Sequence, residues 1–327
     1  MNPPKVWYNT RMILQDNPNE TAETGVVIIG TGLIARFHAD AVEAIPGLKV
    51  VAKCRRTDDW DAALAQPGVG LCLVANASGA HDEAVFAAAR HGVPVLVEKP
   101  IAITTARTDA MIAACEKAGV PLGCIFQTRW SDDFARLRKA VESGELGRIT
   151  YAAVHVPWWR DDAYYTGSDW HGTKAMDGGG ALINQAIHMV DWLTALMPPV
   201  TDVKAFTATL AHPMEAEDTV SAALRFEGGA LGGVYATTAS FPGRGKRIEI
   251  TGTKGTIVVE DSQHGSSNAG AIPCEEHRKC IEAFMASVRG GAPYPIDGRE
   301  ARKPVDLIER IYRDAATGGS QRVSGRG

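Results

Sequence analysis

A short glycine-rich turn near the start of the chain limits its fold more than any other feature of the sequence. Residues 25–30 read GVVIIG, a short apolar run, and residues 30–35 read GTGLIA. The helical spacing of LIARFHADAVEAI follows, and then LKVVAKC, a second run rich in β-branched residues. The order strand, glycine turn, helix, strand predicts a β-α-β unit of the dinucleotide-binding type.

Each small residue of GTGLIA has a physical reason to be there. Gly30 permits a tight turn, Gly32 lets the backbone approach a pyrophosphate, and Ala35 allows close packing of the helix. The N–H groups at the start of the helix would face the phosphates. A glycine turn without a ligand is the alternative. The predicted cofactor contacts here are Gly30, Thr31, Gly32, Leu33 and Ile34.

The end of the second predicted strand bears on the choice of cofactor. An acidic residue at this place would bind the adenosine ribose of NAD, but the chain reads Lys53-Cys54-Arg55-Arg56. A guanidinium can hold phosphate oxygens in bidentate fashion, so Arg55 and Arg56 favour the 2′-phosphate of NADP over NAD. Two solvated loop arginines are the alternative interpretation.

The rest of the first half continues the alternation of strands and helices. Apolar runs at 70–76, 93–100 and 120–127 are separated by alanine-rich helical stretches at 80–91 and 105–118, which predicts a parallel sheet covered on both faces. Lys99, in the sequence Glu98-Lys99-Pro100, falls at the carboxyl edge of this sheet, where such folds bind ligands. A lysine here could relay a proton or stabilise an alkoxide. A surface lysine before a turn, without a catalytic role, would give the same sequence pattern.

The pattern changes after Trp130. A helix is predicted at 131–143, then strands at 148–156, 202–210, 219–226, 230–239 and 247–260 that appear antiparallel, and finally helices at 275–289 and 298–316. The expected division is a polar extension over 1–24, an α/β Rossmann domain over 25–130, and an α+β domain with a large, mostly antiparallel sheet over 131–327.

The segment 177–191, DGGGALINQAIHMVD, is the strongest candidate for a catalytic element. Asn184, His188 and Asp191 fall at i, i+4 and i+7, which predicts one polar stripe on an otherwise apolar helix. Aligned polar groups on such a helix need partners. His188 is suited to proton transfer near neutral pH, although a single histidine is more often a core residue.

Aromatic and cationic residues gather between 158 and 171. Aromatic faces with hydrogen-bonding edges suit a sugar ring, although a hydrophobic loop cluster explains the tryptophans nearly as well. The predicted substrate contacts are Arg160, Tyr165, Trp170 and His171, together with Asn184.

Composition excludes several other classes of function. The net charge is -4 and no Lys/Arg cluster occurs, so nucleic-acid binding is not expected. The 6 cysteines form no C-x-x-C pair, so they read as buried thiols in a reducing compartment and no metal site is predicted. No apolar run reaches the length of a signal peptide or a membrane span, which favours a cytoplasmic protein without a membrane anchor.

Taken in order, GTGLIA, EKP and DGGGALINQAIHMVD make the chain resemble the glucose-fructose oxidoreductase / inositol dehydrogenase / rhizopine catabolism (Gfo/Idh/MocA) family, from about Val26 to Gly318. The resemblance implies hydride transfer between a nicotinamide cofactor and a hydroxyl of a sugar, polyol or nucleotide sugar. It also implies a homodimer or homotetramer formed through the open face of the second sheet.

The resemblance also assigns residues. It places Asn76 and His81 near the nicotinamide, Gln127 in the wall of its pocket, and Glu98 and Lys99 in the motif that contacts the cofactor ribose and substrate. His188 corresponds to the general acid/base, with Lys99 assisting or substituting for it and Asn184 orienting substrate or imidazole. The predicted catalytic residues are therefore Lys99, His188 and Asn184.

Two departures from the family pattern stand out. Many members carry aspartate where this chain has Asn184, and the segment 57–69 is much shorter than the usual helix, strand and helix. Asn184 supplies no negative charge, so we expect a less basic His188. The short segment weakens the NADP prediction. A redox-neutral, NAD-dependent glycosidase, a non-catalytic cofactor-sensing regulator and a biliverdin-reductase-like enzyme remain as alternatives.

Overall fold

A computed structural model describes residues 23–261 and 274–318, so the predicted extension over 1–24 lies almost wholly outside the described residues. The chain divides into two compact units. Unit 1 contains 1–101, 106–127 and 273–300, and unit 2 contains 102–105, 128–272 and 301–327. The segment 273–300, which the sequence division places with the C-terminal part, thus belongs to unit 1.

Unit 1 is built on a five-stranded sheet in the order β2-β1-β3-β4-β5, and all of its strand pairs are parallel. The apolar runs become central strands because both faces are covered, and Val26, Ile28 and Leu73 have no exposed surface. The strands are β1 (Thr24–Ile29), β2 (Leu48–Cys54), β3 (Val69–Val74), β4 (Val95–Val97) and β5 (Leu122–Cys124).

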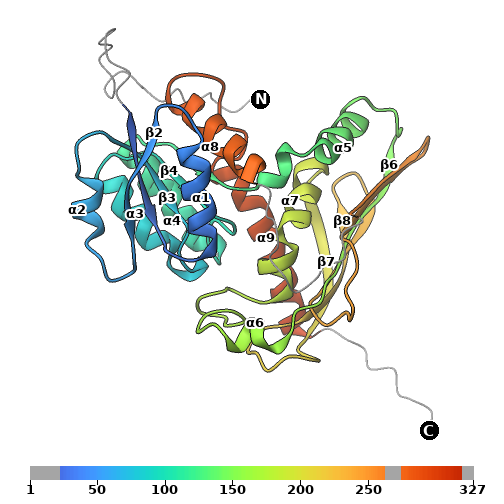
Figure 1. The fold of residues 1–327 in the computed structure, drawn as a ribbon. Helices are drawn as coiled ribbons and strands as arrows, with labels where there is room; N and C mark the ends of the chain where they lie inside the picture. Colours follow the sequence, from blue (N-terminus) through green and yellow to red (C-terminus); the bar gives the residue numbers. More distant parts are fainter. Residues whose placement is uncertain (1–22, 262–273, 319–327) are drawn as a thin grey trace. The chain divides into compact units, whose positions relative to one another are not determined.

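Helices cover this sheet (Figure 1), and three of them, α1, α3 and α4, were predicted from the sequence, whereas α2 and α8 were not predicted here. They are α1 (Leu33–Glu43), α2 (Trp60–Leu64), α3 (His81–Arg90), α4 (Thr105–Ala118) and α8 (Cys274–Val288). α8 packs on α1, and Tyr294 beyond it donates its hydroxyl to the carbonyl of Cys124 in β5 at 2.9 Å. These contacts explain why 273–300 is part of unit 1.

Unit 2 contains a six-stranded sheet in the order β11-β10-β6-β9-β8-β7. Every neighbouring pair is antiparallel except β6 and β9, which are parallel because the chain between them passes through several helices and two strands. The strands are β6 (Ile149–Pro157), β7 (Val200–Ala208), β8 (Thr219–Phe226), β9 (Leu231–Thr237), β10 (Arg247–Gly252) and β11 (Thr256–Glu260). The predicted fold class is confirmed.

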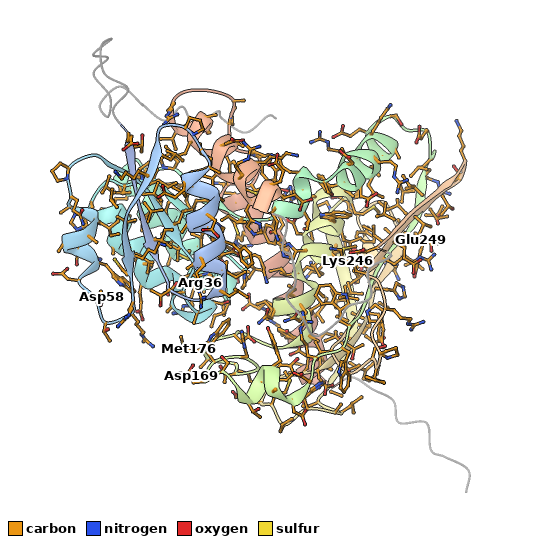
Figure 2. All side chains as sticks on the ribbon, in the orientation of Figure 1. Arg36, Asp58, Asp169, Met176, Lys246 and Glu249 are labelled. Carbon is orange, nitrogen blue, oxygen red and sulfur yellow. The ribbon has the colours of Figure 1, made fainter. Side chains whose placement is uncertain are left out.

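The two faces of this second sheet differ. One face carries buried residues such as Val154, Val220 and Ile250 and packs on α7 (Ile187–Leu196). The opposite face carries Glu249, which Figure 2 labels on β10. Further helices are α5 (Asp132–Glu142), α6 (Asp162–Thr166) and α9 (Gly298–Thr317).

Among the described residues, no helix combines the length and apolar character that crossing a membrane requires. The cysteines whose side chains are described are buried, as predicted, and form no disulfide with one another: Cys54, Cys72, Cys115, Cys124 and Cys280.

Candidate functional site

The glycine turn of unit 1 has the geometry of a phosphate cradle. Gly30 has a φ of 130°, and a Cβ there would collide with the carbonyl of Ala75, so only glycine fits. Gly32 has nothing within 4 Å of its Cβ position, which leaves the backbone open to a ligand. Gly32 is also the N-cap of α1 and no side chain caps this helix. Uncapped N–H groups beside open backbone fit the pyrophosphate of a dinucleotide.

At the carboxyl edge of the same sheet, two buried side-chain oxygen atoms also suit a bound dinucleotide. Among the described residues, Asn76 Oδ1 and Gln127 Oε1 are buried and have no hydrogen-bond partner. His81 bridges two loops here: its Nδ1 lies 2.9 Å from the Pro100 carbonyl oxygen and its Nε2 lies 3.1 Å from that of Asn76. Burial lowers the pKa of His81, partly offset by these carbonyls. Buried acceptors of this kind suit ribose hydroxyls or a carboxamide.

Arg55 and Arg56 lie in the exposed turn after β2. The turn is fixed through its backbone: Arg55 N–H donates to Asp58 Oδ2 at 2.7 Å, and its carbonyl accepts from Trp60 Nε1 at 2.8 Å. Asp58 is labelled in Figure 2. Among the described residues, neither guanidinium has an ion pair or hydrogen bond, so both are open to an anion. The short helix α2 follows this turn.

Glu98 and Lys99 follow β4 at the same edge. Lys99 is half-buried, whereas Glu98 is 6% exposed and accepts a hydrogen bond from His38 Nε2 at 2.7 Å. Burial acts to raise the pKa of Glu98, but the hydrogen bond and charge of His38, with His277 and Lys99, outweigh it and lower this pKa to about 2. The carboxylate is therefore ionised at neutral pH. The sequence did not predict that His38 and His277 contact Glu98, because both histidines lie on helices distant from Glu98 in the chain.

In unit 2 the glycines of DGGGALINQAIHMVD allow a close backbone crossing. A Cβ on Gly180 would collide with the carbonyl of Glu217, and the carboxylate of Glu217 accepts from the N–H groups of Gly180 at 3.0 Å and Leu182 at 2.9 Å. Residues Ala181–Ala186 then form a π-helical turn that leads into α7. This wider turn is a frequent feature of functional sites.

A polar network surrounds this turn. Asn184 Nδ2 donates to Asp177 Oδ1 at 2.6 Å, and Gln185 Nε2 donates to Tyr164 Oη at 2.9 Å and to Asn184 Oδ1 at 3.2 Å. Arg160 donates to Gln185 Oε1 at 2.8 Å. Asp177 is 1% exposed, so its carboxylate fixes Asn184 from inside unit 2. Sequence reasoning missed Asp177, Tyr164 and Gln185 as members of the site.

His188 is half-buried in the first turn of α7, one turn beyond Asn184. Asp191, the third residue of the predicted polar stripe, lies three residues after His188 on α7. Asp191 is fully buried and accepts two hydrogen bonds from Arg129, at 2.6 and 2.7 Å. The π-turn changes the helical spacing before Ile187, and Asp191 serves an internal ion pair.

The aromatic residues of this stretch contact one another, and the rings of Tyr164 and Tyr165 meet edge to face with centroids 5.0 Å apart. Tyr164 stacks on His171 with ring centroids 4.4 Å apart, and Trp170 contacts His171 at 4.0 Å. Burial raises the pKa of Tyr164 to about 12, so its hydroxyl stays protonated. Tyr165 instead is 6% exposed and donates its hydroxyl to Thr238 Oγ1 at 2.8 Å. Its ring faces the interior of unit 2.

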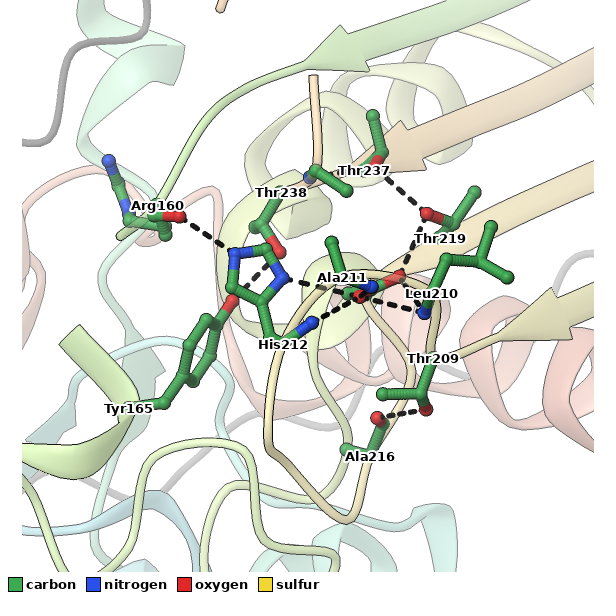
Figure 3. A network of polar contacts seen from close by, with 12 residues as sticks. Arg160, Tyr165, Thr209, Leu210, Ala211, His212, Ala216, Thr219, Thr237 and Thr238 are labelled. Carbon is green, nitrogen blue, oxygen red and sulfur yellow. Dashed lines mark hydrogen bonds and ion pairs between the residues drawn. The ribbon is translucent and has the colours of Figure 1, made fainter. Parts of the chain in front are cut away.

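Figure 3 shows the network that supports this loop. His212 Nε2 donates to the Arg160 carbonyl at 2.7 Å, and its Nδ1 lies 3.2 Å from Asp218 Oδ2. Asp218 also accepts from the backbone N–H groups of 210–212. The backbone of Arg160 is thus anchored from inside, while its guanidinium lies over the rings of Trp158 and Tyr164, 5.3 Å from each centroid.

Two family models match the chain. One, the oxidoreductase family with an NAD-binding Rossmann fold, matches residues 24–126, and the other, the GFO/IDH/MocA C-terminal domain, matches 134–258. A Rossmann unit with a phosphate cradle, followed by an open-sheet unit with a histidine-bearing helix, defines the class of NAD-binding oxidoreductases. Within that class, the chain belongs to the Gfo/Idh/MocA family, as its motifs predicted.

Similar proteins include sugar and polyol dehydrogenases. Myo-inositol dehydrogenase Hyg17 of Streptomyces leeuwenhoekii is 30% identical over 90% of this chain and 98% of its own. D-apiose dehydrogenase of Paraburkholderia graminis is 26% identical over 89% and 87%. The WlbA dehydrogenase of Bordetella pertussis, solved with NADH and UDP-GlcNAcA, is 31% identical over 91% and 96%, with a TM-score of 0.83.

Proposed function

We propose that this chain is a dehydrogenase that oxidises a ring CH–OH group of a sugar or nucleotide sugar, with His188 as the base that takes the hydroxyl proton. The observation that carries the proposal is the network of Arg160, Tyr164, Asn184 and Gln185 around the π-turn, which presents amide, hydroxyl and guanidinium groups among aromatic rings one turn before His188. A ring with several hydroxyls matches such a surface.

In the proposed reaction His188 takes a proton and Lys99 stabilises a charge. The O–H proton passes to the imidazole of His188 while the carbon–hydrogen bond breaks and its electron pair leaves as hydride, for which bound nicotinamide supplies the acceptor. The Lys99 ammonium group stabilises the oxygen as it gains negative charge. Asn184, fixed by Asp177, orients the substrate, and Arg160, Trp170 and His171 determine specificity. We assign the aromatic contact to Tyr164 rather than to Tyr165, because Tyr165 is buried inside unit 2 whereas Tyr164 is half-buried.

The cofactor is held by residues of unit 1 in this proposal. The turn from Gly30 to Ile34 receives the pyrophosphate, Asn76, His81, Glu98, Lys99 and Gln127 face the nicotinamide half, and Arg55 with Arg56 receives a 2′-phosphate. NAD binding is a family property, and the two open arginines support a preference for NADP.

We also propose that two or more copies associate through the open face of the six-stranded sheet, as part of a protein that acts in the cytoplasm. The register of the strands places one row of side chains across this face: Phe206, Ser221, Tyr235, His155 and Arg247. The next row contains Ala223, Gly233 and Ala153, small residues that leave the centre of the face flat. Phe206 is 67% exposed and Leu231 is 53% exposed. A flat face rimmed by exposed apolar residues suits a second copy of the same sheet.

The test is turnover on a panel of inositols, aldoses, uronic acids and UDP-sugars, followed by nicotinamide absorbance. We expect activity on at least one compound and a drop in kcat of about 10²–10⁴-fold in His188→Ala, since a general base contributes on that order. Cofactor affinity, measured by nicotinamide fluorescence, should stay within about threefold of wild type, which is less than one tenfold step in the dissociation constant. Cofactor binding without turnover on any compound, or full turnover in His188→Ala, would overturn the proposal.

A further inference from the structure

Two buried histidines that the proposed reaction does not use meet the carboxylate of Glu98 inside unit 1. His38 comes from α1 and is fully buried, and His277 comes from α8 and is 1% exposed. Glu98 Oε1 lies 2.7 Å from His38 Nε2 and 3.9 Å from His277 Nε2. The two rings meet edge to face, with centroids 5.2 Å apart. One carboxylate oxygen is therefore enclosed by two imidazoles.

The other oxygen of Glu98 is held by the residue that follows it. Oε2 accepts the backbone N–H of Lys99 at 3.0 Å, so the carboxylate links α1 to the backbone of Lys99. On the other side of Lys99, the carbonyl of Pro100 lies 2.9 Å from Nδ1 of the buried His81. Buried polar contacts thus hold the chain immediately before and after this lysine.

The charge on Glu98 depends on the same neighbours. Burial raises the pKa of a carboxyl group, and here the His38 hydrogen bond and charge, helped by His277 and Lys99, lower it to about 2. The charge of Glu98 adds to the burial that raises the pKa of Cys280 on α8, and it partly offsets the burial that lowers the pKa of His81 on α3. Without His38, burial would favour the protonated carboxyl, and Lys99 would lose the negative charge beside it.

We propose that His38 is a positioning residue for Lys99: its ring fixes the Glu98 carboxylate, which in turn holds the Lys99 backbone and interacts electrostatically with the lysine. His277 closes the cluster on its second side. The inference rests on the proposed function only where it gives catalytic work to Lys99.

The same three side chains could in principle ligate a metal ion, since their ligand atoms lie within 4.8 Å of one another. The direct His38–Glu98 contact of 2.7 Å favours the hydrogen bond. Two ligands placed tetrahedrally around zinc, each about 2.0–2.2 Å from it, would be separated by roughly 3.3–3.6 Å. Metal occupancy is therefore one of the outcomes that the experiment decides.

The experiment compares His38→Leu, which removes the hydrogen bond, with His38→Gln, which keeps a donor at the reach of Nε2. His91→Gln is the matched control, because His91 is an exposed histidine of the same unit, bonded only to Asp61 among the interactions described for it. Titration of Lys99 is followed by NMR after ¹³C-dimethylation of the lysines, with its signal assigned through Lys99→Arg. Steady-state kinetics and metal content are measured on the same preparations.

We expect His38→Leu to lower the pKa of Lys99 and to reduce kcat roughly 10–100-fold, since a displacement of about 1 Å in a catalytic group has effects of that order. His38→Gln should recover most of both losses, and His91→Gln should match wild type. An unchanged Lys99 titration in His38→Leu would overturn the proposal, as would equal damage in His38→Gln. So would stoichiometric zinc that disappears in both His38 variants. If wild type turns over no sugar but the Lys99 titration still moves, the positioning role stands and the proposed function fails.

Discussion

At the scale of single residues, the two arginines after β2 set the cofactor preference that we propose. A guanidinium that grips a phosphate makes charge-assisted hydrogen bonds worth about 1.5–3 kcal/mol, or roughly 10–100-fold in affinity. We expect Arg55→Asp to weaken NADPH binding by about this factor while NADH affinity changes little. Arg289→Asp, an exposed arginine elsewhere in unit 1, serves as control and should bind both cofactors as wild type does. Fluorescence titration with each cofactor decides the point. Tighter binding of NADH than NADPH by wild type would show that the arginines are solvated loop residues.

Single residues also show where sequence reasoning stops. Lys99 and His188 stand in motifs whose spacing reflects local backbone geometry, so both could be proposed as catalytic residues from the sequence alone. The role of Asp177 could not be predicted from the sequence. Its hydrogen bond to Asn184 depends on the π-turn that contains Asn184, and the spacing of apolar residues does not predict such a turn. Asn184 itself supplies no negative charge, but the buried carboxylate of Asp177 lies 2.6 Å from its amide nitrogen.

At the scale of elements, the turn from Gly178 to Ala186 in unit 2 leaves little room for a larger side chain. In Gly180→Ala the new methyl group would press on the Glu217 carbonyl and on Met214, and overpacking of this kind costs about 1–3 kcal/mol. We expect a lower thermal midpoint and, because the turn holds Asn184, a fall in kcat larger than any change in the affinity for cofactor. Gly255→Ala is the matched control, since its nearest neighbour would be an ordinary 3.5 Å away. Calorimetry and kinetics on the two variants test this. If Gly180→Ala and Gly255→Ala had the same thermal midpoint and kcat, the contact between Gly180 and the Glu217 carbonyl would not be tight.

Most helices and strands could be predicted from the sequence, but several of the pairs that they form could not. Alternating apolar residues predicted β8 and β9 because each strand has one buried face, and the Rossmann strands were predicted from continuous apolar runs. The parallel pairing of β6 with β9 was missed, because pairing across a long connection depends on the packing of the whole unit. The assignment of α8 to unit 1 escaped the sequence for a similar reason, since its partner α1 lies more than 200 residues away in the chain.

At the scale of the whole molecule, the open face of the second sheet raises the question of what covers it. A monomer would leave Tyr151, Phe206 and Leu231 in water, and exposed apolar residues on a flat sheet favour association. Ala223 lies in the small-residue row of this face and its side chain is exposed, so Ala223→Arg places a long cation where two sheets would meet without disturbing the buried side of β8. Ala113→Arg makes the same change at an exposed position of α4.

We therefore expect light scattering after gel filtration to give a dimer or tetramer for wild type and for Ala113→Arg, and a smaller species for Ala223→Arg. Like charges brought together across a two-fold interface repel, and burying an unpaired cation adds a desolvation cost, so the variant should dissociate even at high protein concentration. Dissociation with intact cofactor affinity would show that the Rossmann unit does not depend on the interface. A monomeric wild type, or an Ala223→Arg variant of unchanged mass, would mean that the copies do not meet through this face.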